Sequence, residues 1–248
     1  MCIRDRFISA YPSTLRNIAI HFDRKKQYFE SAKILHVTSE STDNITRRLL
    51  ARIFPLARII ETYTTTEAGL IGYECLHDDG FHIAEDSTIV EITDESPGRI
   101  VVTDLTNFAT PIIRYNGLGD LCSWEEKQCG CGSLSRRIKH LEGRLVDSIT
   151  LHDGSTQSPY IITNALESVA GLYSYQFIQH DIGRFEIIAV KDSTNDIITS
   201  SIIEQCNDVV TRVLGEKCNL IISFVDEIVP PPGAHKIPLV ISNMRRQL

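Results

Sequence analysis

The stretch ARIIETYTTTEAG, residues 57–69, decides the fold class, because it joins a short apolar strand to a row of hydroxyl-bearing side chains. Upstream, the run AKILHV at 32–37 predicts another strand, and one apolar stripe at helical spacing runs through 45–53 until Pro55 ends it. The hydroxyls at 39–42 are the candidate N-caps of this helix. Because strand, helix and strand follow one another, the sequence favours a parallel sheet.

The segments on either side of this unit have different periods. Residues 7–35 carry helical spacing, with apolar residues recurring every three or four positions. From about Phe81 the pattern changes to short β-type runs separated by Gly and Pro turns, which continue through 108–124 and predict antiparallel structure. We therefore expect the C-terminal part of a large α/β domain that ends in a β-rich subdomain.

A third pattern begins after Asp147 and is typical of a small α+β domain of about 100 residues. We therefore place a boundary there, with the end of the large domain in 1–147 and a small, mobile C-terminal domain in 148–248. The elements expected in the second part are a helix at 160–169, strands at 175–180 and 185–191, a long amphipathic helix at 197–214 and a last strand at 220–225.

Composition removes several classes of function. The 248 residues carry a net charge of −7, so no overall basic field attracts nucleic acid. Hydrophobic residues make up 42% and charged residues 23%, which excludes disorder over most of the chain. No apolar run approaches the roughly 20 residues that span a bilayer, and no apolar N-terminal segment predicts secretion. We expect a cytoplasmic protein without a nucleic-acid or membrane partner.

Several motifs carry groups that suit a nucleotide. The hydroxyls of 64–66 follow a strand, where they can bind phosphate oxygens, and Glu67 beside them can hold Mg²⁺. Asp120 follows a glycine turn and could accept both hydroxyls of a ribose. A proline-rich loop presents Lys236, whose ammonium suits a phosphate or carboxylate oxygen. Each motif taken singly also fits an ordinary loop, turn or solvated lysine, and the run EGRLVD at 142–147 also fits a surface turn with an ion pair.

The order and spacing of these motifs resemble the adenylate-forming superfamily, and within it the branch of phenylacetate–CoA ligases and capsular-polysaccharide enzymes. YTTTE at 63–67 is similar to the family's Tyr-Gly-x-Thr-Glu, and GRIVVTDLTNFATPIIRYNGLGDL at 98–121 is similar to its Arg-Tyr…Asp segment. CGCGSLSRRIKHLEGRLVD at 129–147 resembles the branch's C-x-C-G…Gly-Arg-x-x-Asp run, and YPSTL at 11–15 also resembles family sequence. The resemblance covers essentially everything after Arg6.

The chain departs from the family pattern in a few places. The family's Gly-rich Ser/Thr phosphate loop would lie before residue 1, and MCIRDR at 1–6 resembles translated sequencing-adapter sequence, so we expect the complete protein to begin upstream. Thr64 stands where the family usually has Gly, the segment 115–120 is one residue longer, and His235 precedes the lysine where Gly is common. Without the phosphate loop, we expect this fragment to be inactive alone.

The resemblance implies the fold of adenylate-forming enzymes and an AMP-forming acid–thiol ligase activity. A carboxylate would attack the α-phosphate of ATP to give an acyl-adenylate and pyrophosphate, and the thiol of CoA would then displace AMP. Negative charge builds on the phosphorus in the first step, so Mg²⁺ and a cation are needed there. The implied partners are a small carboxylic acid, ATP and CoA, and the family is compatible with a homodimer.

The resemblance also assigns roles to residues. The catalytic positions are Thr66 at the α-phosphate, Glu67 at Mg²⁺, and Lys236, which the small domain would bring in for adenylation. Asp147 would be the hinge about which that domain rotates between the half-reactions. The nucleotide-binding positions are Tyr63 against the adenine, Thr65, Asp120 at the ribose hydroxyls, and Arg144 beside them.

Seven cysteines in a chain without a secretion signal favour a metal site over a disulfide framework. Cys129 and Cys131 form a tight C-x-C turn that can direct two thiolates at one ion, and zinc needs four ligands. Cys75 and His82 are the candidates for the other two, with His82 preferred to His77 because a strand holds it more rigidly. A similar Cys…His…Cys-x-Cys pattern in part of the related branch supports this structural zinc site. The alternative is four unrelated residues, with buried cysteines acting as small hydrophobic side chains.

Two other functions stay open beside the ligase. One is a remnant that binds nucleotide without catalysis, against which the presence of both Asp120 and Lys236 argues. The other is a zinc-containing interaction module, which would need a basic or aromatic binding face that we do not find in the sequence. Neither the acid nor the final acceptor, which could be CoA, a carrier protein or an amine, follows from the sequence.

Overall fold

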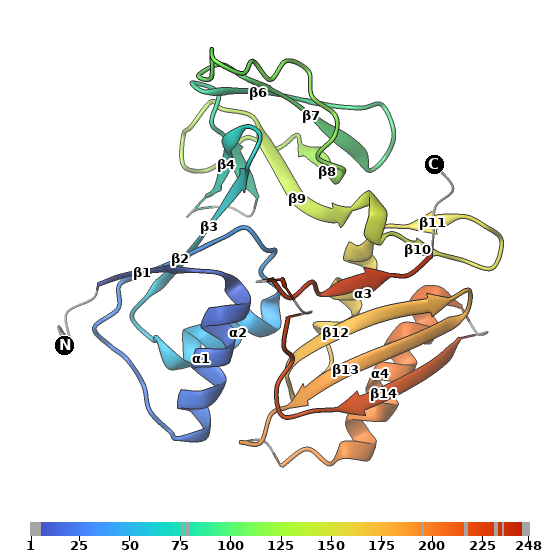
Figure 1. Ribbon diagram of the computed structural model, residues 1–248. Helices are drawn as coiled ribbons and strands as arrows, with labels where there is room; N and C mark the ends of the chain where they lie inside the picture. Colours follow the sequence, from blue (N-terminus) through green and yellow to red (C-terminus); the bar gives the residue numbers. More distant parts are fainter. Residues whose placement is uncertain are drawn as a thin grey trace.

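Figure 1 shows the chain in a computed structural model. No helix in the described residues is long and apolar enough to cross a membrane. The adapter-like residues 1–5 and the departure at His235 lie outside the described residues. The described residues are 6–75, 77, 80–194, 196–215, 218–230, 233–234 and 236–244.

The chain begins with alternating strands and helices. Strands β1, β2 and β3 pair in parallel in that order, which confirms the predicted parallel sheet. Helices α1 and α2 lie together on one face of these strands, where their apolar residues pack on Leu35 and Val37 (Figure 1). The bounds are β1 Phe7–Ala10, α1 Pro12–Arg24, β2 Ile34–Thr38, α2 Asn44–Ile53 and β3 Arg58–Thr65.

Two local predictions in this part were wrong. Of the residues 7–35, only α1 is helical, because β1 pairs with β2 and Pro12 occupies the first turn, where its missing N–H costs nothing. Helix α2 is capped by Asp43 rather than by the hydroxyls at 39–42, since the Asp43 carboxylate accepts the N–H of Thr46 at 2.8 Å.

The sheet continues in antiparallel strands, which confirms the β-rich segment. It has nine strands in the order β1-β2-β3-β4-β5-β9-β8-β7-β6. In the order of the sheet, β4, β5 and β9 lie between β3 and β8. Asp120 at the start of β8 nevertheless bonds to Tyr63 on β3, which shows that the sheet curls. The added bounds are β4 Gly69–Glu74, β5 Phe81–Ile83, β6 Thr88–Ile92, β7 Gly98–Asp104, β8 Asp120–Glu125 and β9 Arg137–Arg144.

Beyond β9, the described strands pair only with one another. Strands β10 and β11 form a hairpin, and a second sheet has the order β14-β13-β12-β15. Helix α4 covers one face of this sheet, with Ile202 in the same core as Phe177 and Ile187 (Figure 1). The bounds are η1 Leu145–Asp147, β10 Ile149–Thr150, β11 Thr156–Gln157, α3 Pro159–Leu166, β12 Leu172–Asp181, β13 Arg184–Lys191, α4 Thr199–Leu214, β14 Asn219–Phe224 and β15 Val240–Ser242.

The predicted last strand, 220–225, is not the last. It corresponds to β14, and β15 follows it after the proline-rich loop. Strand β15 spans only Val240–Ser242, too short for a period to be visible in the sequence, and its partner β12 lies far back in the chain. The domain boundary at Asp147 stays a prediction.

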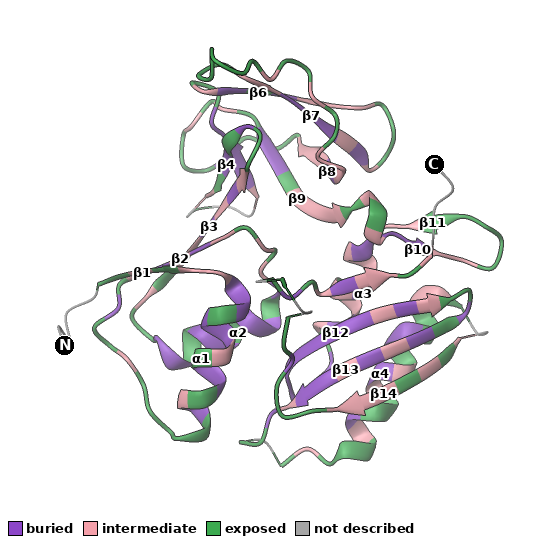
Figure 2. Cartoon of the chain, viewed as in Figure 1, coloured by how far each residue is buried: buried purple, intermediate pink, exposed green. Residues whose placement is uncertain are grey.

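The other face of the second sheet packs on α1 and α2. Tyr173 of β12 lies in one apolar cluster with Leu15 of α1, and its hydroxyl donates to Asp23 at 2.7 Å. Arg52 of α2 bonds to Asp23 and also contacts Asp192 at 3.4 Å. Figure 2 shows buried residues along β12 and β13 and on the helix faces that meet them. The two sheets are therefore held in a defined arrangement by apolar and polar contacts.

Candidate functional site

A cavity of about 980 Å³ lies where β2 and β3 end, and residues of the C-terminal region close one side of it. Ligands of open α/β sheets bind at this position, outside the carboxyl ends of the parallel strands. Every residue predicted to catalyse, to bind nucleotide or to act as the hinge lines this cavity. They are Tyr63, Thr65, Thr66, Glu67, Asp120, Arg144, Asp147 and Lys236.

The hydroxyl-rich motif lies in the β3–β4 hairpin. The sequence placed it after the strand, but β3 runs to Thr65, because its residues pair with those of β4. The turn comprises residues 66–68, and the Thr65 hydroxyl accepts the N–H of Ala68 at 3.1 Å. Thr66 and Glu67 are exposed at the cavity. The hairpin thus presents a hydroxyl and a carboxylate at the cavity.

Asp120 begins β8 and lines the cavity beside Tyr63 of β3. The Tyr63 hydroxyl donates to its Oδ2 at 2.6 Å, and the Arg144 Nε lies 3.6 Å from its Oδ1. Burial raises the pKa of Asp120, while the Tyr63 hydrogen bond and Arg144 lower it. Burial, and then the Asp120 charge, also raise the pKa of Tyr63, so this residue stays a neutral donor. The turn that aims Asp120 needs Gly119, whose φ of 72° is unfavourable for other residues.

Asp147 and Lys236 complete the cavity from the C-terminal side. Burial raises the pKa of Asp147, and the Arg144 charge lowers it. The Lys236 Nζ lies 5.9 Å from the centre of the Tyr11 ring, within the range of a cation–π contact. Its neighbour Ile237 is buried in the cluster of α1 and α2. The side chain of Lys236 is exposed. Its backbone is held in place by the buried side chain of Ile237 next to it.

Two glutamates at the same cavity, the buried Glu61 and the half-buried Glu74, were missed from the sequence. The Arg47 Nη2 lies 2.7 Å from Glu61 and 3.0 Å from Glu74, so one guanidinium serves two carboxylates. One negative charge remains in excess, and burial with the Glu74 charge outweighs Arg47 and raises the pKa of Glu61 to about 7. The only signal was a glutamate at the end of the strand-like run ARIIE at 57–61.

This pair predicts a pH-dependent stability that Glu61→Gln removes. The folded-state pKa of Glu61 lies above its ordinary value of 4.5. Its stabilising contribution is therefore fully present below about pH 4.5 and is lost as the pH rises through about 7. Urea unfolding gives the free energy of unfolding of each protein. The value for the wild type minus the value for the variant should fall by about 2 kcal/mol from pH 5 to pH 8. Substitution of the exposed Glu204 by Gln is the control, and a constant difference for Glu61→Gln across this range would contradict the assignment.

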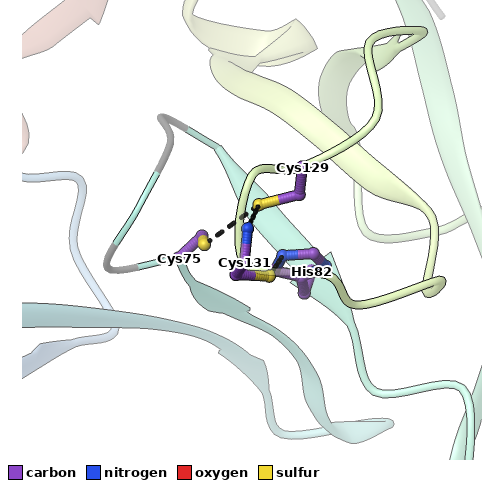
Figure 3. Close-up of side chains that lie close together, drawn as sticks. All are labelled: Cys75, His82, Cys129 and Cys131. Atoms are coloured by element: carbon purple, nitrogen blue, oxygen red, sulfur yellow. Dashed lines mark hydrogen bonds between the residues drawn. The ribbon is translucent and has the colours of Figure 1, made fainter.

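The predicted zinc ligands come together on the β-rich side of the molecule (Figure 3). The Sγ atoms of Cys75 and Cys129 are 3.3 Å apart, and the Cys131 Sγ lies 3.4 Å from the His82 Nε2. The four donor atoms all lie within 4.8 Å of one another. A tetrahedron with bonds of about 2.0–2.3 Å has edges of about 3.3–3.8 Å.

The surroundings of these four residues suit a metal ion. His82 lies on β5, as predicted, and its Nδ1 is 2.9 Å from the Ser135 hydroxyl, which fixes the ring. The ring is buried, and Cys129 is buried with it. The less favoured candidate His77 is exposed, and its backbone nitrogen lies 3.4 Å from the Cys75 Sγ.

No protein-family model and no curated protein matches the sequence. Solved structures do match. A 2-hydroxyisobutyryl-CoA ligase in the postadenylation state with 2-HIB-AMP gives a TM-score of 0.78 over 97% of this chain and 55% of its own, at 17% identity. An anthranilate CoA ligase with anthranoyl-AMP gives a TM-score of 0.65 over 91% of this chain and 47% of its own, at 14% identity. A benzoate CoA ligase from Burkholderia xenovorans LB400 gives a TM-score of 0.63 over 92% of this chain and 49% of its own, at 14% identity.

These matches establish the fold as that of the adenylate-forming CoA ligases, and the chain spans about half the length of those ligases. The same 2-hydroxyisobutyryl-CoA ligase in an open conformation, with 2-HIB-AMP and CoA, gives a TM-score of only 0.56. Because the two structures are of one protein, the difference in score reflects how its parts are arranged. This chain therefore superposes better on the postadenylation structure than on the open one.

Proposed function

We propose that this chain is part of an AMP-forming acid–CoA ligase, which activates a carboxylic acid as an acyl-adenylate and then transfers the acyl group to CoA. The observation that carries the proposal is that the motifs share one cavity, at the carboxyl ends of β2 and β3. Motifs from widely separated parts of the sequence converge there, and their functional groups match those that an adenylate needs. The fold agrees with the proposal.

Binding of the nucleotide would be the task of the β3–β4 hairpin and β8. Asp120, oriented by Tyr63 and Arg144, would accept hydrogen bonds from the ribose hydroxyls. Thr66 would donate to an oxygen of the α-phosphate. Mg²⁺, when bound, would offset phosphate charge, and the exposed carboxylate of Glu67 offers the oxygen ligand that this ion prefers.

The first half-reaction needs a positive charge where negative charge develops. Lys236 supplies an ammonium in the lining of the cavity, 5.9 Å from the centre of the Tyr11 ring. A donor of this kind acts by electrostatic stabilisation of the transition state. Rotation about Asp147 would then withdraw Lys236 and admit the thiol, which is the role of the small domain in residues 148–248.

The finer assignment is to the phenylacetate–CoA ligase branch. It is supported by the run at 129–147, which carries both the C-x-C-G turn and Arg144 with Asp147. We also propose a structural zinc ion held by Cys75, His82, Cys129 and Cys131. This ion would tie the loop before β9 to the β4–β5 hairpin and would take no part in the chemistry.

The proposed function can be tested with the complete gene product. Pyrophosphate release in the presence of ATP, Mg²⁺ and a panel of aryl, arylacetic and fatty acids should rise above background for at least one class of acid. Addition of CoA should then yield the thioester. No release with any acid, together with measurable binding of AMP, would instead favour the non-catalytic nucleotide-binding remnant.

A further inference from the structure

Glu40 lies in the loop between β2 and α2, whose hydroxyls were the predicted caps of α2. It lies two residues after the end of β2 and lines the candidate cavity, at the carboxyl end of a parallel strand. The preceding residue, Ser39, has a φ of 70°, a left-handed conformation that side chains rarely adopt. This backbone turn sets the direction from which Glu40 enters the structure.

The carboxylate of Glu40 joins two parts of the chain. Its Oε1 accepts the backbone N–H of Ile237 at 3.1 Å and the hydroxyl of Ser13 at 3.0 Å. Its Oε2 accepts the backbone N–H of Ser13 at 3.0 Å. Ser13 lies in the first turn of α1, where N–H groups have no partner within the helix and a negative charge is favourable. The bonds to Ser13 therefore hold the Glu40 side chain against α1 even when its bond to Ile237 is not formed.

The bond to Ile237 bears directly on Lys236. Ile237 is buried among residues of α1 and α2, and its N–H belongs to the peptide bond that joins it to Lys236. Holding that N–H limits how the Lys236 backbone can rotate or slide. The ammonium in turn lies over Tyr11, the N-cap residue of the helix on which Glu40 is anchored.

We propose that Glu40 is the residue that positions Lys236 for acyl-adenylate formation. This inference rests on the proposed ligase function. The carboxylate acts through the backbone of Ile237 and touches no reacting atom. Because it keeps its bonds to Ser13, it presents a ready acceptor each time the C-terminal region returns to the arrangement seen here. The second half-reaction does not use Lys236, so it does not need Glu40.

Hydrogen exchange on the 248-residue chain tests the contact independently of activity. In Glu40→Ala, the peptide that contains Ile237 should exchange about 10-fold faster or more than in the wild type. Glu40→Gln keeps an oxygen that can accept this N–H, so its exchange should stay near that of the wild type. Asn17→Ala is the matched control, since Asn17 also bonds across to the C-terminal part of the chain, at the side chain of Glu227 rather than at the backbone next to Lys236. Unchanged exchange in Glu40→Ala would overturn the proposal.

Kinetics of the complete gene product test the catalytic consequence. Glu40→Ala should lower the kcat of ATP–pyrophosphate exchange by about 10- to 100-fold, because a small displacement of a catalytic group has an effect of this size. The KM for ATP and the rate of thioester formation from supplied acyl-adenylate should change little, and Glu40→Gln should restore most of the exchange. Equal loss in both half-reactions would mean a general structural role and would overturn the inference. If the wild type itself exchanges no pyrophosphate with any acid, the proposed function fails, whereas normal exchange in Glu40→Ala rejects the role of Glu40 alone.

Discussion

Substitution of Lys236 by alanine in the complete gene product is expected to slow acyl-adenylate formation by about 10²- to 10³-fold. The ammonium would stabilise charge that exists only in the transition state of that step, so the loss should be in kcat rather than in the KM for ATP. Thioester formation from a supplied acyl-adenylate should remain near the wild-type rate, since the lysine has no part in thiol attack. ATP–pyrophosphate exchange measures the first step, and consumption of the acyl-adenylate by CoA measures the second.

A control for the loss of one positive charge is Lys191→Ala. Lys191 also belongs to the C-terminal region, but its Nζ contacts Thr199 and lies outside the cavity lining. This variant should leave both half-reactions unchanged. If Lys236→Ala slowed both half-reactions equally, Lys236 would have a structural rather than a catalytic role.

The second large effect is expected at the Cys/His cluster. The purified 248-residue chain should contain about one equivalent of zinc, as four N and S ligands in a closed site predict. Cys129→Ser should lose most of the metal. Because the ion binds the folded state, its loss should lower the free energy of unfolding by about 3 kcal/mol, or the melting temperature by roughly 6–12 °C. Metal analysis and thermal unfolding with and without chelator provide the measurements.

Cys218→Ser is the matched substitution outside the cluster. Cys218 is a free cysteine whose Sγ donates to the carbonyl of Gly215, and it should keep full zinc content. Less than about a tenth of an equivalent of zinc in the wild type would end the proposal. The four residues would then be a packed group of small side chains whose thiols happen to meet.

The elements that the sequence predicted well are those whose pattern is local. The apolar runs of β2 and β3 and the stripe of α2 lie on single segments, so their period alone indicates strand or helix. Apart from the cap of α2, which Asp43 forms locally, the errors occurred where pairing with another strand decides the outcome. Strand β1 forms because β2 lies beside it, and β15 forms because β12 does. The extension of β3 to Thr65 likewise depends on its pairing with β4.

The residues of the candidate site also fall into those that the sequence could predict and those that it could not. Asp120, Lys236 and the hydroxyl motif could be named because their order resembles a known family, and the structure places them around one cavity. Glu40 and Glu61 could not be named, since a single glutamate in a loop or a strand has no distinguishing pattern. Their significance comes from the groups that face them, namely the N–H of Ile237 and the shared guanidinium of Arg47.

The sequence by itself determined the parallel α/β start, the β-rich continuation and the residue types at the site, because these depend on the period and the chemistry of neighbouring residues. Only the tertiary structure decided that Cys75 and His82 meet Cys129 and Cys131, and that Glu40 reaches Ile237. These contacts join segments separated by long stretches of chain. These contacts form only when the sheet curls and the two regions pack against each other. A metal site or a positioned lysine depends on distances between atoms, and the order of the residues does not set those distances.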